Sequence, residues 1–447
     1  MVRLGKFFSL VHNEYIKIFK KTSTKIMLVL ILLGAFAFSG FMLLILKTSS
    51  YLVDYESDFR NSIQSNIDEL KQTKPEGYEK DIEIYQLVLD ENMEIEDWRY
   101  SALDSIVEVP EVPDADKDKI ISFVKNKDDK GYCEYMSKNA ENESEKWAYE
   151  YRVQHNIGLT DEYKDQNKLI DEAENCKMSL AVTSEGNDEY NNLKDRETLA
   201  LYQLEHEIYI NTADYSGLSD VDVFMDSSGE SNFWIAFMNV SSLVSFVGLL
   251  MIVIAGGSVS SEFSQGTIKF LLINPVKRWK ILMAKYFSCI TIGYIMLVIT
   301  YIISIPAVGI IHGFNEMSAP YLYVKAGEVH QMSSFLFVAR QFLVNSVQVV
   351  VMATMAFAIS SLVRSSALAI GVSVFAMFAG NTITGILSQL KQDWARYLVF
   401  SNVDLLGISQ GNSLFPQQTV GFAVCVLAAH MVVFLLTAWD GFTKKSV

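Results

Sequence analysis

Apolar and polar segments alternate along the chain, and six of the apolar segments are long enough to cross a membrane. A helix needs about 20 apolar residues to span roughly 30 Å of hydrocarbon. The first segment, IMLVLILLGAFAFSGFMLLIL at residues 26–46, holds no charge and starts too late for an ordinary signal-peptide core. The other predicted spans are residues 233–255, 286–311, 335–359, 367–387 and 419–438. The pattern predicts an all-α membrane protein with six transmembrane helices.

Residues 1–25 carry an apolar stripe at helical spacing, with lysines beside it. The stripe consists of Leu4, Phe7, Phe8, Val11, Tyr15, Ile18 and Phe19. A basic amphipathic helix lying on the inner leaflet explains both features. The alternative, a simple positive flank of the first span, explains the lysines but not the stripe.

Residues 48–232 are too long for a loop and form a predicted domain of their own. Segments such as NSIQSNIDELKQ and DEYKDQNKLIDEAENCKMSLA place apolar residues three and four apart, as amphipathic helices do. Pro110 and Pro113 mark a turn between two helical groups. The pattern contains no convincing series of strands, so this domain is predicted to be mostly helical.

The formal net charge of −15 combines two parts of opposite charge. Residues 48–232 hold 45 acidic and 18 basic side chains, whereas the rest of the chain holds 7 acidic and 19 basic ones. Because the positive charges lie in short segments beside apolar runs, the chain lacks the basic footprint of a nucleic-acid-binding protein.

The distribution of Lys and Arg also predicts the orientation, because these residues concentrate on the cytoplasmic side of membrane proteins. If the N-terminus is cytoplasmic, fourteen of them lie on the cytoplasmic side: in the two terminal segments, in residues 260–285 and, as Arg364, between the fourth and fifth spans. Three lie in the two short outside segments, 312–334 and 388–418. We therefore expect a multi-pass protein of the cell (plasma) membrane. Both termini, including the tail 439–447, should be cytoplasmic, and residues 48–232 should be extracellular.

The four cysteines and the many carboxylates give no strong sign of chemistry. Cys289 and Cys425 lie in apolar runs and are predicted to be packing residues. Cys133 and Cys176 lie in the exported domain, where they either form a disulfide or stay free. The stretch DADKD at 114–118 lacks the glycine and closing glutamate of an EF-hand loop, which favours a solvated acidic face. We predict no metal site and no catalytic residues.

The segment SSEFSQGTIKFLLINPVKRWKILMAK, residues 260–285, joins the second and third spans. Ser260 or Ser261 is predicted to cap a helix that starts at Glu262 and stops at Asn274-Pro275. After it, a basic group with a tryptophan is expected at the inner headgroup level. That group comprises Arg278, Trp279, Lys280 and Lys285. A short helix level with the membrane surface suits the transmission of a push from a cytoplasmic partner.

This segment resembles the intracellular loop of ABC-2 type permeases, the membrane subunits of one class of ATP-binding-cassette exporter. The family pattern is a glutamate, Gly-Thr, an apolar stretch, a proline and a basic residue before the third span. The residues that the resemblance assigns to coupling with the ATPase are Glu262, Phe263, Gly266, Thr267, Phe270, Pro275 and Arg278. The resemblance covers residues 1–47 and 233–447 and implies that 388–418 forms a partly re-entrant segment. The 185-residue insert departs from the minimal family member.

The chain contains no G-x-x-x-x-G-K-[ST] phosphate-binding loop, so hydrolysis must come from a separate subunit if the chain belongs to a pump. The resemblance implies two permease chains, as a homodimer or heterodimer, with two ATPase chains. ATP and Mg would bind to those partner subunits. No cofactor is expected on this chain.

Polar residues inside the spans mark either a translocation route or hydrogen bonds between helices. Because the resemblance places the second and fifth spans beside a central cavity, the candidate route residues are Asn239, Ser242, Phe246, Asn381 and Thr384. The fourth span also contains Arg340, Asn345 and Gln348, which makes it less typical of a span.

The sequence thus favours the permease subunit of an exporter for a hydrophobic or amphipathic substrate such as a peptide, antibiotic or lipid. The alternative is a membrane sensor or immunity protein whose extracellular domain binds a ligand or antimicrobial without transporting it. A secondary transporter would show two similar halves, which this sequence lacks.

Overall fold

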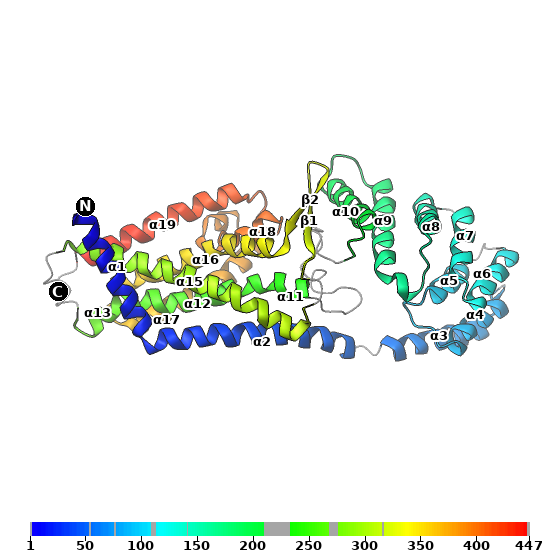
Figure 1. Cartoon of the computed structure of the whole chain (residues 1–447), viewed down its shortest axis with the longest axis horizontal. Helices are drawn as coiled ribbons and strands as arrows, with labels where there is room; N and C mark the ends of the chain where they lie inside the picture. The colour runs from blue at the N-terminus through cyan, green and yellow to red at the C-terminus, as the bar shows by residue number, and fades with distance from the viewer. Residues whose placement is uncertain are drawn as a thin grey trace. The chain divides into compact units, whose positions relative to one another are not determined.

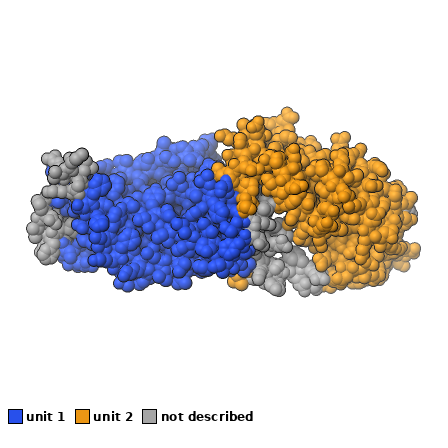
Figure 2. Space-filling view, in the orientation of Figure 1, with its two compact units in different colours: residues 1–43, 231–317, 333–447 blue, residues 44–230, 318–332 orange. Residues whose placement is uncertain are grey.

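The computed structural model describes residues 2–52, 55–75, 77–108, 113–140, 142–209, 233–267, 276–314 and 317–444. The protein is an all-α membrane protein in which nearly every described element is a helix. The chain divides into two compact units, drawn in different colours in Figure 2. Unit 1 comprises residues 1–43, 231–317 and 333–447, and unit 2 comprises residues 44–230 and 318–332.

Unit 1 contains the long apolar helices, which Figure 1 shows running side by side. Its α-helices are α1 (Val2–Lys20), the first part of α2 (Thr22–Leu52), α11 (Phe233–Asn239), α12 (Leu243–Ser258), α13 (Ser260–Ser264), α15 (Arg278–His312), α16 (Ser334–Leu362), α17 (Ser366–Gln389), α18 (Leu405–Ser409) and α19 (Val420–Thr443). Its 3-10 turns are η2 (Val240–Ser242), η3 (Asp393–Tyr397) and η4 (Val399–Ser401).

Six helical segments of the described chain have the length and hydropathy of a membrane span, as predicted. They are Thr22–Ile45, Ala236–Ser258, Arg278–His312, Ser334–Leu362, Ser366–Gln389 and Val420–Thr443. The third is the longest, because α15 begins at Arg278, within the predicted loop, and continues for 35 residues. At 1.5 Å per residue this helix is roughly 50 Å long, so it extends beyond the hydrocarbon.

The second span is not one continuous helix. The α11 helix ends at Asn239, the 3-10 turn η2 follows, and α12 begins at Leu243. Such a stretch inside a helical span often marks a hinge, because its i→i+3 hydrogen bonds differ from those of the flanking turns.

The helices α12 and α16 form the centre of unit 1. More than half of each apolar segment is buried, whereas α2, α17 and α19 are mostly exposed and apolar, as expected of helices that face lipid. At one end of this centre the Phe233, Trp234 and Phe237 side chains are fully buried. The Trp234 ring lies 4.8 Å from the ring of Phe335 on α16, measured between centroids. Aromatic packing of this kind fixes α11 against α16.

The N-terminal helix α1 packs against α15. The Phe7 ring lies 6.1 Å from that of Phe287, and the Ser288 hydroxyl donates to the Val11 carbonyl oxygen at 3.4 Å. The Phe8 and Phe19 side chains remain exposed. In Figure 1, α1 crosses the end of the long helices of unit 1 and leads into α2.

Unit 2 is a helical domain, as the sequence predicts. Its elements are α3 (Tyr55–Thr73), α4 (Tyr78–Asp90), α5 (Trp98–Glu108), α6 (Asp114–Asn126), α7 (Asp129–Asn139), α8 (Glu143–His155), the 3-10 turn η1 (Asp161–Tyr163), α9 (Lys164–Val182) and α10 (Asp188–Glu205). One apolar core joins α3 to α7, where Ile63, Ile67 and Leu103 are almost fully buried. A second core around Ala148 and Ile170 joins α8, α9 and α10.

A two-stranded hairpin also belongs to unit 2, and the sequence analysis did not predict it. The strands β1 (Pro320–Lys325) and β2 (Glu328–Ser333) are joined by Ala326 and Gly327, which both have positive φ angles. A two-residue loop with positive φ at both positions matches the type I′ hairpin turn. The Gln331 side chain on β2 donates to the Tyr202 hydroxyl on α10 at 3.0 Å, so the hairpin is tied to the helical domain.

The disulfide considered for Cys133 and Cys176 is absent, since both are free and buried. Cys133 lies on α7 and Cys176 on α9, and burial raises the pKa of each thiol to about 12. Both thiols therefore behave as small apolar groups. Of the other two, Cys289 is buried, as expected of a packing residue, whereas Cys425 is exposed on α19.

Residues 388–418 form short turns held by buried amides. The Asn402 side chain, which is fully buried, donates to the carbonyl oxygens of Arg396 and Leu398 at 2.8 Å. The Gln418 amide donates to the Asn402 side-chain oxygen at 2.8 Å and to the Ser401 carbonyl oxygen at 2.7 Å. Whether this segment re-enters the membrane stays a prediction.

Candidate functional site at the junction of α1, α13 and α15

The loop that resembles the permease family begins with α13, which follows α12 after a single residue. The backbone N–H groups of Val259 and Ser260 donate to the Ser360 hydroxyl on α16 at 3.2 and 3.0 Å. The Ser260 hydroxyl donates to the Gly256 carbonyl oxygen at 2.7 Å. The predicted serine cap is wrong, because the helix starts at Ser260 itself and has no side-chain cap. These serines instead fix the start of α13 to the fourth span.

Glu262 on α13 belongs to a cluster of four charged side chains from three helices. This junction ion cluster consists of Glu14 and Lys17 on α1, Glu262 on α13 and Lys285 on α15. The Lys285 Nζ atom lies 2.9 Å from Glu14 Oε2 and 3.1 Å from Glu262 Oε1. The Lys17 Nζ atom lies 3.4 Å from Glu14 Oε1 and 3.3 Å from Glu262 Oε1. Two carboxylates and two ammonium groups make the cluster electrically neutral.

Burial makes these ion pairs stronger than ordinary surface pairs. The side chain of Lys285 is 2% exposed and those of Glu14 and Glu262 are each 12% exposed. The expectation that Lys285 anchors at the lipid headgroups is therefore wrong, because its ammonium group points into the junction. A buried charge that loses its partner is costly, so each member of the cluster holds the others in place.

The pKa of Glu262 depends on two opposing effects, burial and pairing with cations. Burial by itself raises the pKa of this carboxyl, but Lys285, the hydroxyl of Thr267 and Lys17 together lower it to about 2. Burial lowers the pKa of Lys17, yet Glu14 and Glu262 outweigh that effect and the pKa is raised. Both groups therefore stay charged at neutral pH.

The predicted helix from Glu262 to Asn274 is interrupted at residues 265–267, which form a turn, and residues 268–275 lie outside the described residues. The α13 helix ends at Ser264, and Gly266 has a φ of 70°, a left-handed conformation that favours glycine. The Thr267 hydroxyl donates to the Glu262 carboxylate. Gly266 and Thr267 thus act on Glu262 by closing the turn beside it. Phe263 is half-buried, whereas Phe270 and Pro275 lie outside the described residues.

Arg278 ties the start of α15 to the end of the last span. Its guanidinium donates to the Thr443 carbonyl oxygen at 3.3 Å, where the α19 helix ends and its dipole is negative. The Trp279 and Trp439 rings stack with centroids 6.0 Å apart. Of the positions that resemble the family, Glu262 connects α13 with α1 and α15, and Arg278 connects α15 with α19. Gly266 and Thr267 form the turn beside Glu262.

The five candidate route residues have different surroundings. Asn239 ends α11, and Ser242 is exposed at the end of η2. Phe246 lies against α2, since a Cβ added to Gly34 would come within 3.4 Å of its ring. On α17 Asn381 is exposed, and the buried Thr384 donates to the Gly380 carbonyl oxygen at 3.0 Å. A role in translocation stays a prediction for all five.

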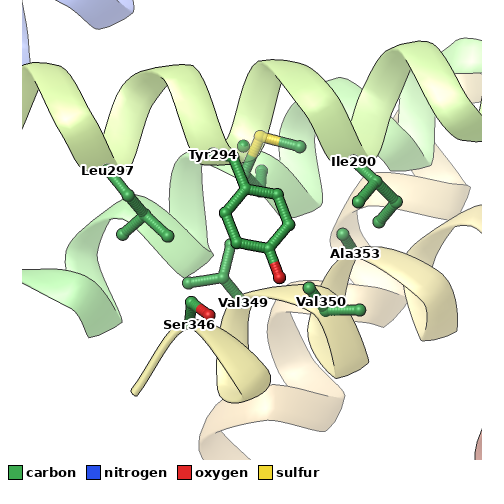
Figure 3. Close-up of a pocket in the computed structure, with 9 residues that line it drawn as sticks. Ile290, Tyr294, Leu297, Ser346, Val349, Val350 and Ala353 are labelled. Carbon is green, nitrogen blue, oxygen red and sulfur yellow. The ribbon is translucent and has the colours of Figure 1, made fainter. Parts of the chain in front are cut away.

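A small apolar pocket lies among α12, α15 and α16, as Figure 3 shows. Tyr294 on α15 extends toward Val349 and Val350 on α16. The enclosed cavity is about 10 Å³, roughly the space of one water molecule and far below a typical ligand site. We assign no ligand to it.

The junction ion cluster is suited to mechanical connection of helices. Among the described residues no group of three or more His, Cys, Asp and Glu side chains is placed to hold a metal ion. The carboxylates are neutralised by lysines, which leaves no basic group free to accept a proton. What the arrangement does is fix three helices to each other.

The sequence analysis missed Glu14, Lys17 and Lys285 as partners of Glu262. A signal was present, because Glu14 is the single carboxylate in the first 25 residues and Glu262 is the single one between Ser260 and Lys285. A lone carboxylate in a basic, apolar segment needs a cation when it is buried.

The fold and the comparisons agree on the class: the protein is a multi-pass membrane protein. Residues 206–447, just over half of the chain, match the family described as protein of unknown function (DUF2705), and the chain belongs to that family. Uncharacterized protein YhcI of Bacillus subtilis (strain 168) is 36% identical over 261 residues, which cover 57% of this chain and 78% of the relative. Uncharacterized membrane protein YdbK of the same strain is 29% identical over 223 residues, which cover 49% and 86%.

Proposed function

We propose that the protein is the permease subunit of an ABC-2 type exporter that moves a hydrophobic or amphipathic substrate. In this proposal a separate ATP-binding-cassette subunit supplies the energy, and two permease chains assemble with two ATPase chains. The observation that carries the proposal is the junction ion cluster. It joins the short helix after the second span to the N-terminal helix and to the third span.

The cluster suits coupling because it makes three helices move as one body. The side chains of Ser264 and Gln265 are exposed next to the buried Glu262 contacts, so a partner can touch the turn directly. A displacement of α13 would then reach α15 through Lys285, α1 through Lys17 and α16 through Ser360. Transmission of a movement from α13 to the other helices requires rigid contacts between them, which paired buried charges provide.

The orientation belongs to the same proposal. The excess of Lys and Arg on the side of the junction supports cytoplasmic termini and a cytoplasmic α13. The acidic unit 2 would then lie outside the plasma membrane.

The test is affinity purification of the tagged chain from its host, identification of a bound ATP-binding-cassette subunit by mass spectrometry, and co-expression of the two proteins. We expect the two proteins to co-purify in detergent and to show ATP-dependent export in inverted vesicles. Glu262→Arg places a third cation against Lys17 and Lys285, so it should reduce export strongly while the ATPase still hydrolyses ATP. The control is Asp440→Arg, which alters an exposed ion pair with Lys444 on the same side. No bound ATPase, or unchanged export by Glu262→Arg, would reject the proposal.

A sensor or immunity protein is the second candidate, favoured by the separate apolar cores of unit 2. A domain with its own cores can bind a ligand without a transport cycle. Reconstitution in liposomes separates the two functions, since an exporter depletes its substrate from one compartment and a sensor does not.

A further inference from the structure

The helix α16 carries three amide side chains on one face, and neither the coupling site nor the predicted route uses them. Gln341, Asn345 and Gln348 are spaced i, i+4 and i+7, which places them within an arc of about 60° on a helix. We call them the amide stripe. The opposite face of α16 carries Leu336 and Leu343, which are 61% and 65% exposed. The stripe therefore faces away from the lipid-exposed side.

Three contacts show how the second span and α16 are aligned, and one of them is made by the stripe residue Gln348. The Trp234 ring meets that of Phe335, the Ser245 hydroxyl donates to the Gln348 side-chain oxygen at 3.3 Å, and the Ser260 N–H donates to Ser360. The paired residue numbers differ by 101, 103 and 100, so the second span and α16 run parallel in one register. By this register Gln341 and Asn345 lie beside η2, the 3-10 turn that interrupts the second span.

The turn adds polar groups at the same level. A 3-10 turn breaks the regular i→i+4 ladder, so backbone carbonyl groups near it bond less ideally. Asn239 and Ser242 flank the turn on the second span. Polar groups of two neighbouring helices thus meet at one level of an otherwise apolar bundle.

The hydrogen-bonding capacity of the stripe exceeds what the described chain satisfies. Gln341 is 9% exposed, and its buried side-chain oxygen has no hydrogen-bond partner among the described residues. An unsatisfied buried carbonyl is costly, more so inside a membrane, where water does not compensate. Asn345 and Gln348 are only half-buried although they face inward, so space borders them. Helix–helix bonding accounts for the Gln348 oxygen but not for these groups.

The second span and α16 together hold one charged side chain, Arg340. Residues 233–258 contain no charged side chain, and α16 contains none after Arg340, which is exposed about 100° around the helix from Gln341. A neutral site of amides and hydroxyls both donates and accepts hydrogen bonds. It matches other amides and hydroxyls, whereas an ion would be desolvated there without a counter-charge.

We propose that the amide stripe binds the uncharged amide- or hydroxyl-bearing part of an amphipathic molecule whose apolar part lies along the bundle. As a statement of the exported substrate class this rests on the proposed function, but the binding itself requires no ATPase. The route then runs between α12 and α16, beside the break in the second span.

The test uses the full chain in lipid nanodiscs without any ATPase. The probe is N-dodecanoyl-alanyl-alanine amide with a photoreactive diazirine on its acyl chain, and its charged counterpart ends in a free carboxylate. We expect the amide probe to label α12 and α16. The double variant Gln341→Leu/Asn345→Leu should reduce labelling roughly tenfold, the effect of losing two modest hydrogen bonds. The carboxylate probe should label wild type weakly.

Two further variants make the outcome decisive. Gln341→Asn/Asn345→Gln keeps both amides and should retain labelling, which excludes misfolding as the cause of the loss. Gln389→Leu makes the same chemical change at the exposed end of α17, outside the candidate route, and should leave labelling unchanged. Equal labelling of wild type and the leucine double variant, equal labelling by the two probes, or a comparable loss in Gln389→Leu would overturn the proposal. Intact labelling without ATPase association would reject only the exporter function.

Discussion

At the scale of single residues, Lys285 is the most deeply buried charged side chain of the junction ion cluster. Its ammonium group is buried between the carboxylates of Glu14 and Glu262, and the second cation, Lys17, is about half exposed. Removing Lys285 leaves two buried carboxylates with one solvated partner. Removing the charge of Glu262 leaves Lys285 paired with Glu14, which is a smaller loss. Mutation of Lys285 should therefore lower the free energy of unfolding more than mutation of Glu262.

We predict that Lys285→Met lowers stability by about 3 kcal/mol, because it leaves buried charge uncompensated. Glu262→Gln should cost less, about 1 to 2 kcal/mol, since one charged hydrogen bond is weakened while Glu14 remains. Thermal unfolding of the purified protein in detergent measures both. Lys444→Met is the control, because its partner Asp440 is exposed and such pairs contribute under about 1 kcal/mol. A change in Lys444→Met as large as in Lys285→Met would contradict the assignment.

Glu174 on α9 gives unit 2 a dependence on pH. Burial, with a contribution from Asp171, raises the pKa of this carboxyl to about 7 against the opposing effect of Arg152. The folded state therefore holds a proton that the unfolded chain releases near its ordinary pKa of 4.5. Stability from this group is greatest below about pH 4.5 and falls as the pH rises to about 7.

Glu174→Gln imitates the protonated side chain and removes this dependence. We expect the variant to unfold at a higher temperature than wild type at pH 8, with the difference shrinking toward pH 5. Melting curves of the full-length protein in detergent across this range provide the measurement. A variant that is less stable than wild type at pH 8 would show that the carboxylate makes a favourable contact.

At the scale of elements, the turn after α13 determines where Glu262 points. Gly266 has a φ of 70°, and no atom of the described residues would meet a Cβ there, so the opposition to a larger residue comes from the backbone conformation. We predict that Gly266→Ala costs about 1 kcal/mol because alanine is strained in the left-handed region. Gly385→Ala is the matched control, since its Cβ also meets nothing but lies in the regular helix α17. It should be neutral or slightly stabilising. Unfolding temperatures in detergent distinguish the two, and equal effects would exclude backbone strain at Gly266.

The helices, the hairpin and the η2 turn show how much of the fold can be predicted from the sequence. Six apolar segments predicted the spans, and amphipathic segments within residues 48–232 predicted that this domain is mostly helical. Both predictions work because burial in lipid or in a helical core repeats apolar residues at the helical period. The hairpin was missed because its turn is Ala-Gly and not the Asn-Gly that signals type I′. The break at η2 was missed because Val240, Ser241 and Ser242 lie within residues 233–247, a stretch that contains no glycine or proline.

The candidate site was found only in part for a similar reason. Local pattern and resemblance identified Glu262, Gly266, Thr267 and Arg278, which lie in one short segment. The cationic partners of Glu262 lie 245 residues earlier on α1 and 23 residues later on α15. A lone carboxylate signals that a cation is needed, but the sequence does not show which lysine supplies it. Lys285 was assigned to the headgroups because a lysine at the end of a span usually reaches them.

At the scale of the whole molecule, the two units differ in net charge and in how much of each matches the protein family. The family match begins at residue 206 and covers the spans from α11 to α19, whereas most of unit 2 precedes it. The acidic balance lies almost entirely in residues 48–232. The Lys and Arg residues beside the spans predict which ends of the spans are cytoplasmic, and unit 2 lies on the other side in the proposed orientation.

This arrangement predicts opposite accessibility for two exposed positions. Val182, at the end of α9, is 86% exposed, and Ser264 is exposed beside the junction ion cluster. In intact cells an impermeant maleimide should label Val182→Cys and not Ser264→Cys, and Ser264→Cys should react only after permeabilisation. Wild type gives the background, which should be low. Cys133 and Cys176 are buried with their pKa raised to about 12, so few thiolates form, and Cys425 lies in an apolar span. Labelling of Ser264→Cys in intact cells would put the junction outside, beyond reach of any cytoplasmic ATPase, and the exporter proposal would fail with it.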